Sequence, residues 1–238
     1  MDEYRPQMSR NRVDHLRRWH EDASESLHAI GAHDVGYLGL DLHIPAQVFP
    51  PTPTSDLLGS QVRSRVHAGD RVLDMGCGAG ANAILAAQIT GEVVAVDVNP
   101  LAVDATTANA ERNGVGDRVH ASCSDVFDEV SGEFDVIVFD PPFRWFSPHN
   151  PLERALTDEK YRSLGRFMNE VSSRLRLGGE VLLFFGTSGD VEHLDHLIDR
   201  AELNSEVVAE RTLPARGEDT TYFVRSLTAG NAPRSAVP

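Results

Sequence analysis

The sequence predicts an α/β fold, a doubly wound, Rossmann-like sheet of seven mostly parallel strands that is preceded by a short helical segment. Short apolar runs alternate with helical patterns from residue 71 onward, as in parallel sheets whose strands are joined by helices. A glycine-rich turn follows the first of these runs. The run over 134–139 is unbroken, which is typical of a strand buried on both faces.

The elements are expected in a simple order along the chain. Apolar residues spaced among charges over 8–30 predict one or two amphipathic helices, and three glycines over 31–39 interrupt the pattern. Four prolines make 45–53 extended or turning, and a helix follows over 56–66 with Thr54 or Ser55 as its N-cap. Strands are predicted over 71–75, 92–98, 119–122, 134–139, 180–185, 206–211 and 220–226, and helices over 81–89, 100–113, 156–175 and 191–201.

These elements divide the chain into three predicted parts. Residues 1–58 form a helical, substrate-side segment with a linker, and residues 59–228 form the main α/β domain. Residues 229–238, which are rich in small and polar residues, are predicted to be a disordered tail.

The composition is that of a soluble globular protein, with 41% hydrophobic and 24% charged residues, and the expected location is the cytoplasm for the reasons that follow. Neither a membrane-spanning run nor a signal peptide is recognisable. Cys77 and Cys123 lack metal or disulfide spacing, and His193 and His196 have no third ligand nearby, so we predict no metal site. Nothing in the sequence indicates an oligomeric state.

The net charge of −14 makes nucleic acid an improbable partner, because phosphate backbones repel an acidic surface. Only one basic patch is a candidate for binding nucleic acid, and it consists of Arg10, Arg12, Arg17 and Arg18. We interpret this patch as the solvated face of a helix.

A glycine-rich loop follows the strand predicted over 71–75. Gly76, Gly78 and Gly80 let the backbone turn tightly and approach a ligand before a helix begins. This pattern alone also fits NAD-dependent oxidoreductases, but the spacing is G-x-G-x-G rather than G-x-G-x-x-G. Asp74 precedes the glycines, at a position where it would repel a pyrophosphate and attract an ammonium group.

A second acidic residue ends the next predicted strand. Asp97 is placed to accept hydrogen bonds from both hydroxyls of a ribose, and Val98 beside it is assigned to the same site. S-adenosylmethionine (SAM) carries an ammonium group, a ribose and no phosphate, so the two carboxylates favour SAM over NAD. After the third strand, Asp125 either accepts from the adenine amino group, with Val126 beside the base, or simply caps a following helix.

Asp140, Pro141, Pro142 and Phe143 end the strand predicted over 134–139, at the edge where such sheets bind ligands. The prolines fix the backbone and have no N–H, which leaves the carbonyls of Asp140 and Pro141 free to accept hydrogen bonds. A carboxylate and a carbonyl can each accept one N–H of an acceptor nitrogen and so direct its lone pair at a methyl group. The Phe143 ring would pack against the acceptor or the methyl sulfonium. Arg144, Trp145 and Phe146 follow and form either a wall of the substrate pocket or plain core.

Residues 71–143 resemble the class I SAM-dependent methyltransferases, and Asp140–Phe143 resembles their (Asn/Asp)-Pro-Pro-(Tyr/Phe) signature of amino-nitrogen methylation. Upstream, residues 37–42 and 48–58 are similar to the segment that leads into the catalytic domain of HemK-type protein-glutamine methyltransferases. The resemblance implies a SAM-dependent N-methyltransferase that transfers the methyl group without a metal.

The sequence departs from the HemK pattern at several points. Asp140 and Phe143 stand where that group normally has Asn and Tyr, Thr52 and Ser55 replace a basic residue and a threonine, and the N-terminal recognition domain is much reduced. The acceptor is therefore expected to be a protein side chain or, alternatively, a small metabolite, with an RNA base less favoured. A NAD-dependent oxidoreductase and an inactive SAM-binding scaffold are further alternatives, and the Asp-Pro-Pro-Phe motif counts against both.

Overall fold

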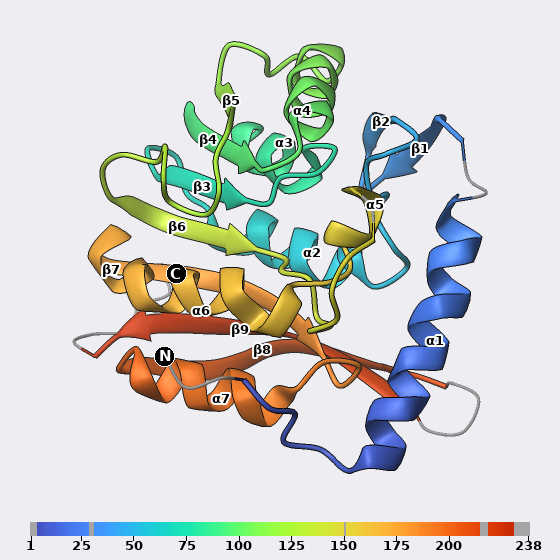
Figure 1. The fold of residues 1–238 in the computed structure, drawn as a ribbon. Coiled ribbons are helices and arrows are strands. Elements are labelled where there is room, and N and C mark those ends of the chain that lie inside the picture. The colour runs from blue at the N-terminus through green and yellow to red at the C-terminus, as the bar shows by residue number, and fades with distance from the viewer. Residues whose placement is uncertain (1–3, 29–30, 150, 215–218, 231–238) are drawn as a thin grey trace.

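A single seven-stranded sheet forms the centre of the molecule, in a computed structural model that describes residues 4–28, 31–149, 151–214 and 219–230 (Figure 1). The strand order is β5-β4-β3-β6-β7-β9-β8. The strands are β3 (Arg71–Met75), β4 (Glu92–Asp97), β5 (Val119–Cys123), β6 (Phe134–Phe139), β7 (Leu175–Gly186), β8 (Leu203–Leu213) and β9 (Thr220–Ala229). Strands β3 to β7 are mutually parallel, whereas β9 runs antiparallel between β7 and β8. The predicted fold class is thereby confirmed.

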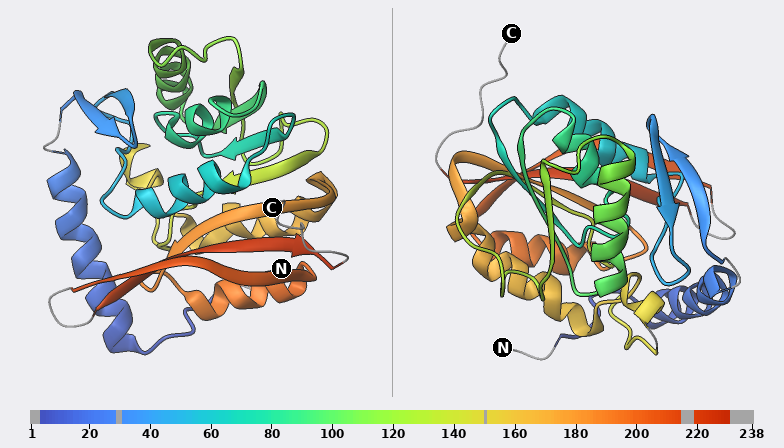
Figure 2. Two further views of the ribbon diagram at one scale, coloured as in Figure 1. Left: turned by 180° about the vertical axis from the view of Figure 1, so that it is seen from behind. Right: turned by 90° about the horizontal axis from the view of Figure 1, so that it is seen from above.

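Helices cover both faces of the sheet (Figure 2). The helices α2 (Ser55–Arg65), α3 (Ala81–Ala87) and α4 (Pro100–Arg112) pack on one face, and α6 (Arg162–Glu170) and α7 (Val191–Arg200) pack on the other. Because successive strand residues point to opposite faces, Val136 and Val138 of β6 join the first core, whereas Ile137 joins the second. Burial on both faces explains why these strands read as continuous apolar runs.

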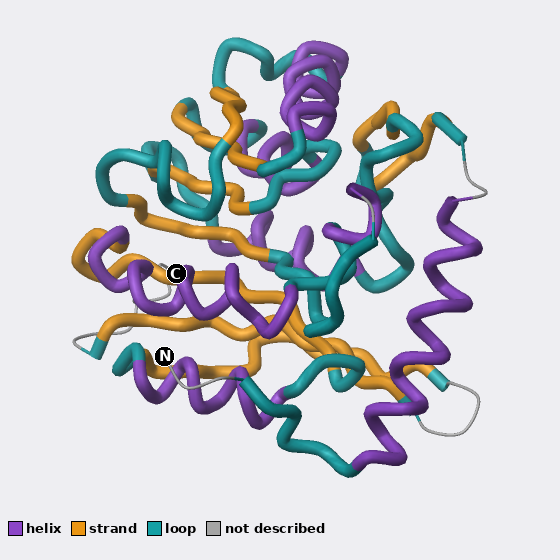
Figure 3. The backbone as a smooth tube through the Cα atoms, viewed as in Figure 1, coloured by secondary structure: helices purple, strands orange, loops and turns teal. Residues whose placement is uncertain are grey.

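The N-terminal region forms one helix and a hairpin. Helix α1 (Arg10–His28) stands beside the edge at which the parallel strands end (Figures 1 and 3). A two-stranded antiparallel hairpin follows, made of β1 (His33–Tyr37) and β2 (Leu40–Ile44), where the sequence predicted only a break. It is held to α4 because the Asn109 side chain accepts from His43 N (2.8 Å) and donates to His43 O (3.0 Å).

Several predicted boundaries were wrong. The helix predicted over 156–175 is reduced to α6, because Lys160 and Tyr161 have left-handed backbones before it and Leu175 already begins β7. A short helix, α5 (Pro151–Arg154), and two 3₁₀ turns, η1 (Glu159–Tyr161) and η2 (Val171–Arg174), complete this region. Strand β9 continues to Ala229, so the predicted disordered tail cannot begin there; residues 231–238 lie outside the described residues.

The start of α2 also differs in detail from the prediction. Thr54 occupies the N-cap position, but its side chain makes no capping hydrogen bond, and the Ser55 hydroxyl instead accepts from Thr52 N at 2.9 Å. Helix α2 runs without interruption through the domain boundary that was predicted at residue 58.

Candidate active site

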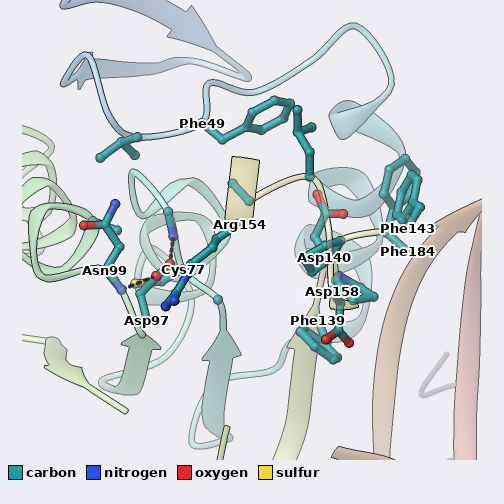
Figure 4. Close-up of a pocket in the computed structure, with 18 of the residues that line it drawn as sticks. Phe49, Cys77, Asp97, Asn99, Phe139, Asp140, Phe143, Arg154, Asp158 and Phe184 are labelled. Carbon is teal, nitrogen blue, oxygen red and sulfur yellow. Dashed lines mark hydrogen bonds between the residues drawn. The ribbon is translucent and has the colours of Figure 1, made fainter. Parts of the chain in front are cut away.

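A cavity of about 1060 Å³ opens at the edge where the parallel strands β3, β4, β5 and β6 end. The loops after these four strands line one side of it, and the proline-rich segment 47–55 lines another. In Figure 4, Asp97 and Asp140 lie at the ends of their strands, and Phe49 lies on the segment that passes over them. The cavity therefore lies where the sequence predicted the ligand site.

The glycine-rich loop takes a conformation that other residues rarely adopt. Gly76, Gly78 and Gly80 have φ values of +72°, +54° and +84°, in the left-handed region that favours glycine. A Cβ atom added to Gly80 would also lie 3.0 Å from three atoms of Thr106. Hydrogen bonds from Gly76 N and Cys77 N to Val96 O fasten the loop to β4. The loop is therefore a fixed backbone surface, of which Gly76 and Gly78 line the cavity whereas Gly80 does not.

Asp97 lies at the end of β4, as predicted, and lines the cavity. Its Oδ2 accepts a hydrogen bond from Gly78 N (3.0 Å) and its Oδ1 from Asn99 N (2.8 Å), as the dashed lines in Figure 4 show. Desolvation outweighs these bonds and raises the pKa of the carboxyl group. Each carboxylate oxygen can accept more than one hydrogen bond, so Asp97 can still receive two ligand hydroxyls.

Asp74 is placed differently from the prediction. It is only 2% exposed and is not part of the cavity lining; its Oδ2 accepts a hydrogen bond from Ala83 N, in the first turn of α3, at 2.9 Å. Burial raises its pKa to about 7, with a smaller contribution from the charge of Asp97. The geometry makes Asp74 a support for the glycine loop, and direct contact with an ammonium group remains a prediction.

An amide that the sequence did not single out faces this region instead. Asn82 lines the cavity, and its Oδ1 is buried without a hydrogen-bond partner among the described residues. An unpaired buried oxygen is costly, so this atom suits a ligand that donates an N–H.

The remaining predicted cofactor residues also line the cavity. The Val98 side chain is 53% exposed, although large apolar residues are normally buried, and it offers an apolar surface to a ligand. Val126 is buried with a left-handed backbone at φ +54°, a strained conformation for a β-branched residue. The Ser124 hydroxyl holds this turn by donating to Val126 O at 2.8 Å.

Of the two predictions for Asp125, the structure contradicts the helix cap and does not test the contact with adenine. It lines the cavity, but its carboxylate pairs with the guanidinium of Arg166 at 3.1 Å. Residues 124–133 form turns, so there is no helix for Asp125 to cap. A contact with adenine remains a prediction for this residue.

Asp140 follows β6 and lies inside the cavity. Its side chain is exposed to solvent in the cavity, and partial desolvation by the cavity walls raises the pKa of its carboxyl group to about 7, with a smaller contribution from Asp74. No hydrogen bond or ion pair joins the Asp140 carboxylate to any residue that the structure describes. The site therefore contains a carboxyl group whose hydrogen-bonding capacity is free for a ligand.

The rest of the motif is held rigidly. Pro141, Pro142 and Phe143 line the cavity, and the Phe143 ring contacts Phe184 and Phe185, with centroid distances of 5.5 and 5.0 Å. The carbonyl of Phe143 accepts a hydrogen bond from the Tyr161 hydroxyl, which itself accepts from Asp190 N at 2.7 Å.

Of the three residues that follow the motif, only Arg144 lines the cavity. Trp145 and Phe146 belong to the core on the α6 and α7 face. Further residues from distant segments line the cavity and were missed from the sequence, among them Trp19, Arg154, Asp158, Glu159 and Arg162. Trp19 reaches it from α1, and Asp158 lines it while accepting hydrogen bonds from Ser163 N and Leu164 N at the start of α6.

Two further expectations concern groups outside the cavity. Arg12 donates to Thr187 O at 3.1 Å and Arg17 lies 4.9 Å from the Phe146 ring centroid, so part of the arginine patch contacts protein. His193 packs against Tyr4 and Tyr161. Within the described ranges there is no group of three potential metal ligands and no helix with the length and hydropathy to cross a membrane.

The residues at the cavity fit SAM. The left-handed glycines allow a ligand to approach the backbone, Asp97 presents its carboxylate, Asn82 has an unpaired oxygen, and Val98 exposes an apolar surface. Together with the strand order, these features define an enzyme of the class I SAM-dependent methyltransferase type.

Comparisons with known proteins also indicate a methyltransferase. Residues 52–212 match the family described as "Methyltransferase small domain", and the chain belongs to this family. It is 31% identical to a putative protein N5-glutamine methyltransferase of Methanocaldococcus jannaschii, over 67% of this chain and 83% of that protein. It is 45% identical to the ribosomal protein L11 methyltransferase of Ralstonia nicotianae, but over only 36% of this chain and 28% of that protein.

Among solved structures, the tRNA m1G37 methyltransferase of M. jannaschii superimposes with a TM-score of 0.62. The match covers 84% of this chain and 55% of that one at 16% identity, and so it shows the shared fold alone. The protein is thus a SAM-dependent methyltransferase, and its relatives differ in the acceptor that their names give.

Proposed function

We propose that the protein is a HemK-like N-methyltransferase that methylates an amino or amide nitrogen of a protein side chain. The observation that carries this proposal is the free carboxyl group of Asp140, which lies inside the cavity directly before two prolines. Support also comes from the relative named as a putative protein N5-glutamine methyltransferase, which matches over most of its length.

SAM supplies a methyl group that is already activated by its positive sulfur, so the main task of the protein is to position the acceptor nitrogen. Gly76, Gly78 and Asn82, which line the cavity, would hold the amino-acid part of SAM, and Asp97 would hold the ribose. Gly80 and Asp74 would support the loop. Val98, Asp125 and Val126 would surround the base. No metal enters this proposal.

Asp140 is proposed to orient the acceptor by accepting one of its N–H groups. The carbonyls of Asp140 and Pro141 are further acceptors at the same point, because neither Pro141 nor Pro142 has an N–H to offer. The ring of Phe143 limits the space on one side of the acceptor, since its neighbours Phe184 and Phe185 fix its position.

Asp140 can also handle a proton. Its carboxyl group has a pKa of about 7, which is close to the pH at which a general base is most effective. An amine nitrogen that receives a methyl group gains positive charge and then loses a proton, and the Asp140 carboxylate can stabilise that charge and accept the proton. An amide nitrogen requires only the hydrogen-bond acceptor.

The second candidate acceptor is a small metabolite. This alternative is favoured by the position of α1, because Trp19 lines the cavity and thereby narrows the space for a folded protein substrate. Incubation of cell extract with the protein and methyl-labelled SAM, followed by mass spectrometry of the protein and small-molecule fractions, distinguishes the two. Label in neither fraction, although SAM binds, would contradict the proposed activity.

Two substitutions at Asp140 test its role once an acceptor is known. Asp140→Ala should leave SAM affinity unchanged and slow methyl transfer by two or more orders of magnitude, about 3 kcal/mol. Asp140→Asn should retain much of the activity if the acceptor is an amide, and little if it is an amine that needs the carboxylate. Near-normal turnover of Asp140→Ala would remove the residue from the mechanism.

A further inference from the structure

Arg144 is a buried cation without an acidic partner. It directly follows the Asp-Pro-Pro-Phe motif and is only 5% exposed. Its Nε has no hydrogen-bond partner, and no ion pair joins the guanidinium to a carboxylate anywhere in the described part of the chain. Its main-chain contacts, a hydrogen bond from Asp158 N to Arg144 O at 2.7 Å and a bridge to Thr157, fix the position of the residue.

This arrangement is unfavourable in the protein alone. Desolvation lowers the pKa of Arg144 to about 10, so that the guanidinium still carries its charge at neutral pH. The Trp19 ring lies over it, with 4.0 Å from the guanidinium carbon to the ring centroid, and compensates only part of the cost of burial. Buried charges in proteins are normally paired and hydrogen-bonded, so a partner is missing.

The missing partner has access through the cavity. Arg144 lines the same cavity as Asp140 and Phe143, and Trp19 covers it from α1. We propose that Arg144 binds a carboxylate group carried by the methyl acceptor, so that the substrate is an amino or amide compound that also bears a carboxylate. This inference rests on the proposed function in one respect, namely that the cavity holds the acceptor.

The surroundings favour a carboxylate over a phosphate. The cavity is lined by more acidic than basic side chains, and this excess of negative charge repels a dianion more strongly than a monoanion. The acidic residues are Asp97, Asp125, Asp140, Asp158 and Glu159, and the basic ones are Arg144, Arg154 and Arg162. A carboxylate is also planar and can accept two parallel hydrogen bonds from a guanidinium whose face is stacked on an aromatic ring.

The Nε–H group of Arg144, which has no hydrogen-bond partner, provides a direct test. We expect the Arg144 Nε–H signal, assigned in a ¹H–¹⁵N spectrum by its absence in Arg144→Lys, to shift in a saturable way on addition of sodium acetate. Acetamide and sodium chloride at matched concentration should leave it in place. The chain provides an internal control in Arg225, whose Nε is also buried without a partner but whose guanidinium is paired with Asp195 outside the cavity. The Arg225 signal should not move.

A substitution gives a second readout. Acetate should raise the Tm of the wild-type protein above its value in chloride, and Arg144→Gln should lose this rise while keeping its affinity for S-adenosylhomocysteine. Arg225→Gln should keep both the rise in Tm and the affinity for S-adenosylhomocysteine.

An Arg144 signal that moves no more in acetate than in chloride, or an acetate-dependent rise in Tm that survives in Arg144→Gln, would overturn the inference. A phosphate affinity about tenfold above that of acetate would equally overturn it. If the wild-type protein does not bind S-adenosylhomocysteine, the proposed function is contradicted. The acetate result then still decides whether Arg144 binds a carboxylate.

Discussion

The carboxylates of the site differ in what holds them, although each follows or ends a strand. Asp97 is tied by two backbone N–H groups, Asp125 by Arg166, and Asp140 by no described residue. A carboxylate that is held by backbone N–H groups can still accept hydrogen bonds from a ligand. A carboxylate that is already paired with a guanidinium gains less binding free energy from such a ligand. These environments lead to different expectations for the three residues.

Asp97→Ala should weaken the binding of SAM by about 1–3 kcal/mol, because two ribose hydroxyls would lose their acceptor. The matched control is Asp125→Ala, which also removes a cavity-lining carboxylate but one that is paired with Arg166. Calorimetric titration with SAM should show a clearly smaller effect for the control. Equal affinities of wild type and Asp97→Ala would mean that the ribose is held elsewhere.

The raised pKa of Asp140 predicts how stability changes with pH. The folded state holds this proton more tightly than the unfolded state, so the contribution of the neutral group is complete below the ordinary pKa of about 4 and is lost as the pH rises through about 7. Asp140→Asn cannot ionise and avoids this loss. In urea unfolding, the stability of Asp140→Asn relative to wild type should therefore increase between pH 5 and pH 8. A difference that does not change with pH would mean that Asp140 titrates normally.

At the scale of elements, the N-terminal segment is connected to the acceptor motif by a chain of hydrogen bonds. The Tyr4 hydroxyl (2.7 Å) and Gln7 N (2.8 Å) both donate to Oδ2 of Asp190. Asp190 N donates to the Tyr161 hydroxyl, which donates to Phe143 O. Residues that are far apart in the sequence thus fix the position of the acceptor loop.

Tyr161→Phe should destabilise the protein by about 1–3 kcal/mol, because it leaves the buried N–H of Asp190 and the carbonyl of Phe143 without partners. Tyr4→Phe removes one hydrogen bond at the start of the same chain and should cost less, about 0.5–1.5 kcal/mol. Urea unfolding gives both values, and SAM affinity should be unchanged in either variant. A larger cost for Tyr4→Phe than for Tyr161→Phe would contradict this order.

The sequence predicted the central elements well because their signals are local. The apolar runs at β3 and β6 and the proline and glycine that bound α4 determine those elements with little help from the rest of the chain. The hairpin also had a signal, since Leu40, Leu42 and Ile44 alternate with polar residues, but the nearby glycines were given more weight. The helix predicted over 156–175 had the correct apolar spacing. It begins late because Lys160 and Tyr161 take left-handed backbones, and η2 follows its end at Glu170 before β7 begins.

In the candidate site, too, the residues with a local sequence signal could be predicted and those placed by distant segments could not. The glycine loop, Asp97 and Asp140 could be placed from the sequence because each lies at the end of a predicted strand. Asp74 was assigned to the ligand, although its position at a strand end serves the first turn of α3 equally well. Trp19 and Asp158 reach the cavity through the folding of distant segments, and no local pattern marks them.

At the scale of the whole molecule, the acidic charge bears on which acceptor class the enzyme can use. The net charge of −14 is spread over the chain, and the candidate basic patch on α1 is partly used for contacts within the protein. Proteins that neutralise phosphates release counterions, so their affinity for nucleic acid falls steeply with salt. We therefore expect weak binding to tRNA or duplex DNA with almost no salt dependence.

Fluorescence anisotropy with labelled tRNA and labelled duplex DNA, each at low and at physiological salt, measures this directly. The logarithm of the binding constant is plotted against the logarithm of the salt concentration. For duplex DNA, each phosphate contact contributes a slope of about −0.9 to this plot. We expect a slope near zero for this protein. Arg10→Gln and Arg18→Gln together should change nothing, since these side chains are exposed and are not part of the cavity. A steep slope that this double substitution flattens would instead place nucleic acid on α1, beside the cavity, and would make an amine of an RNA base the first choice of acceptor.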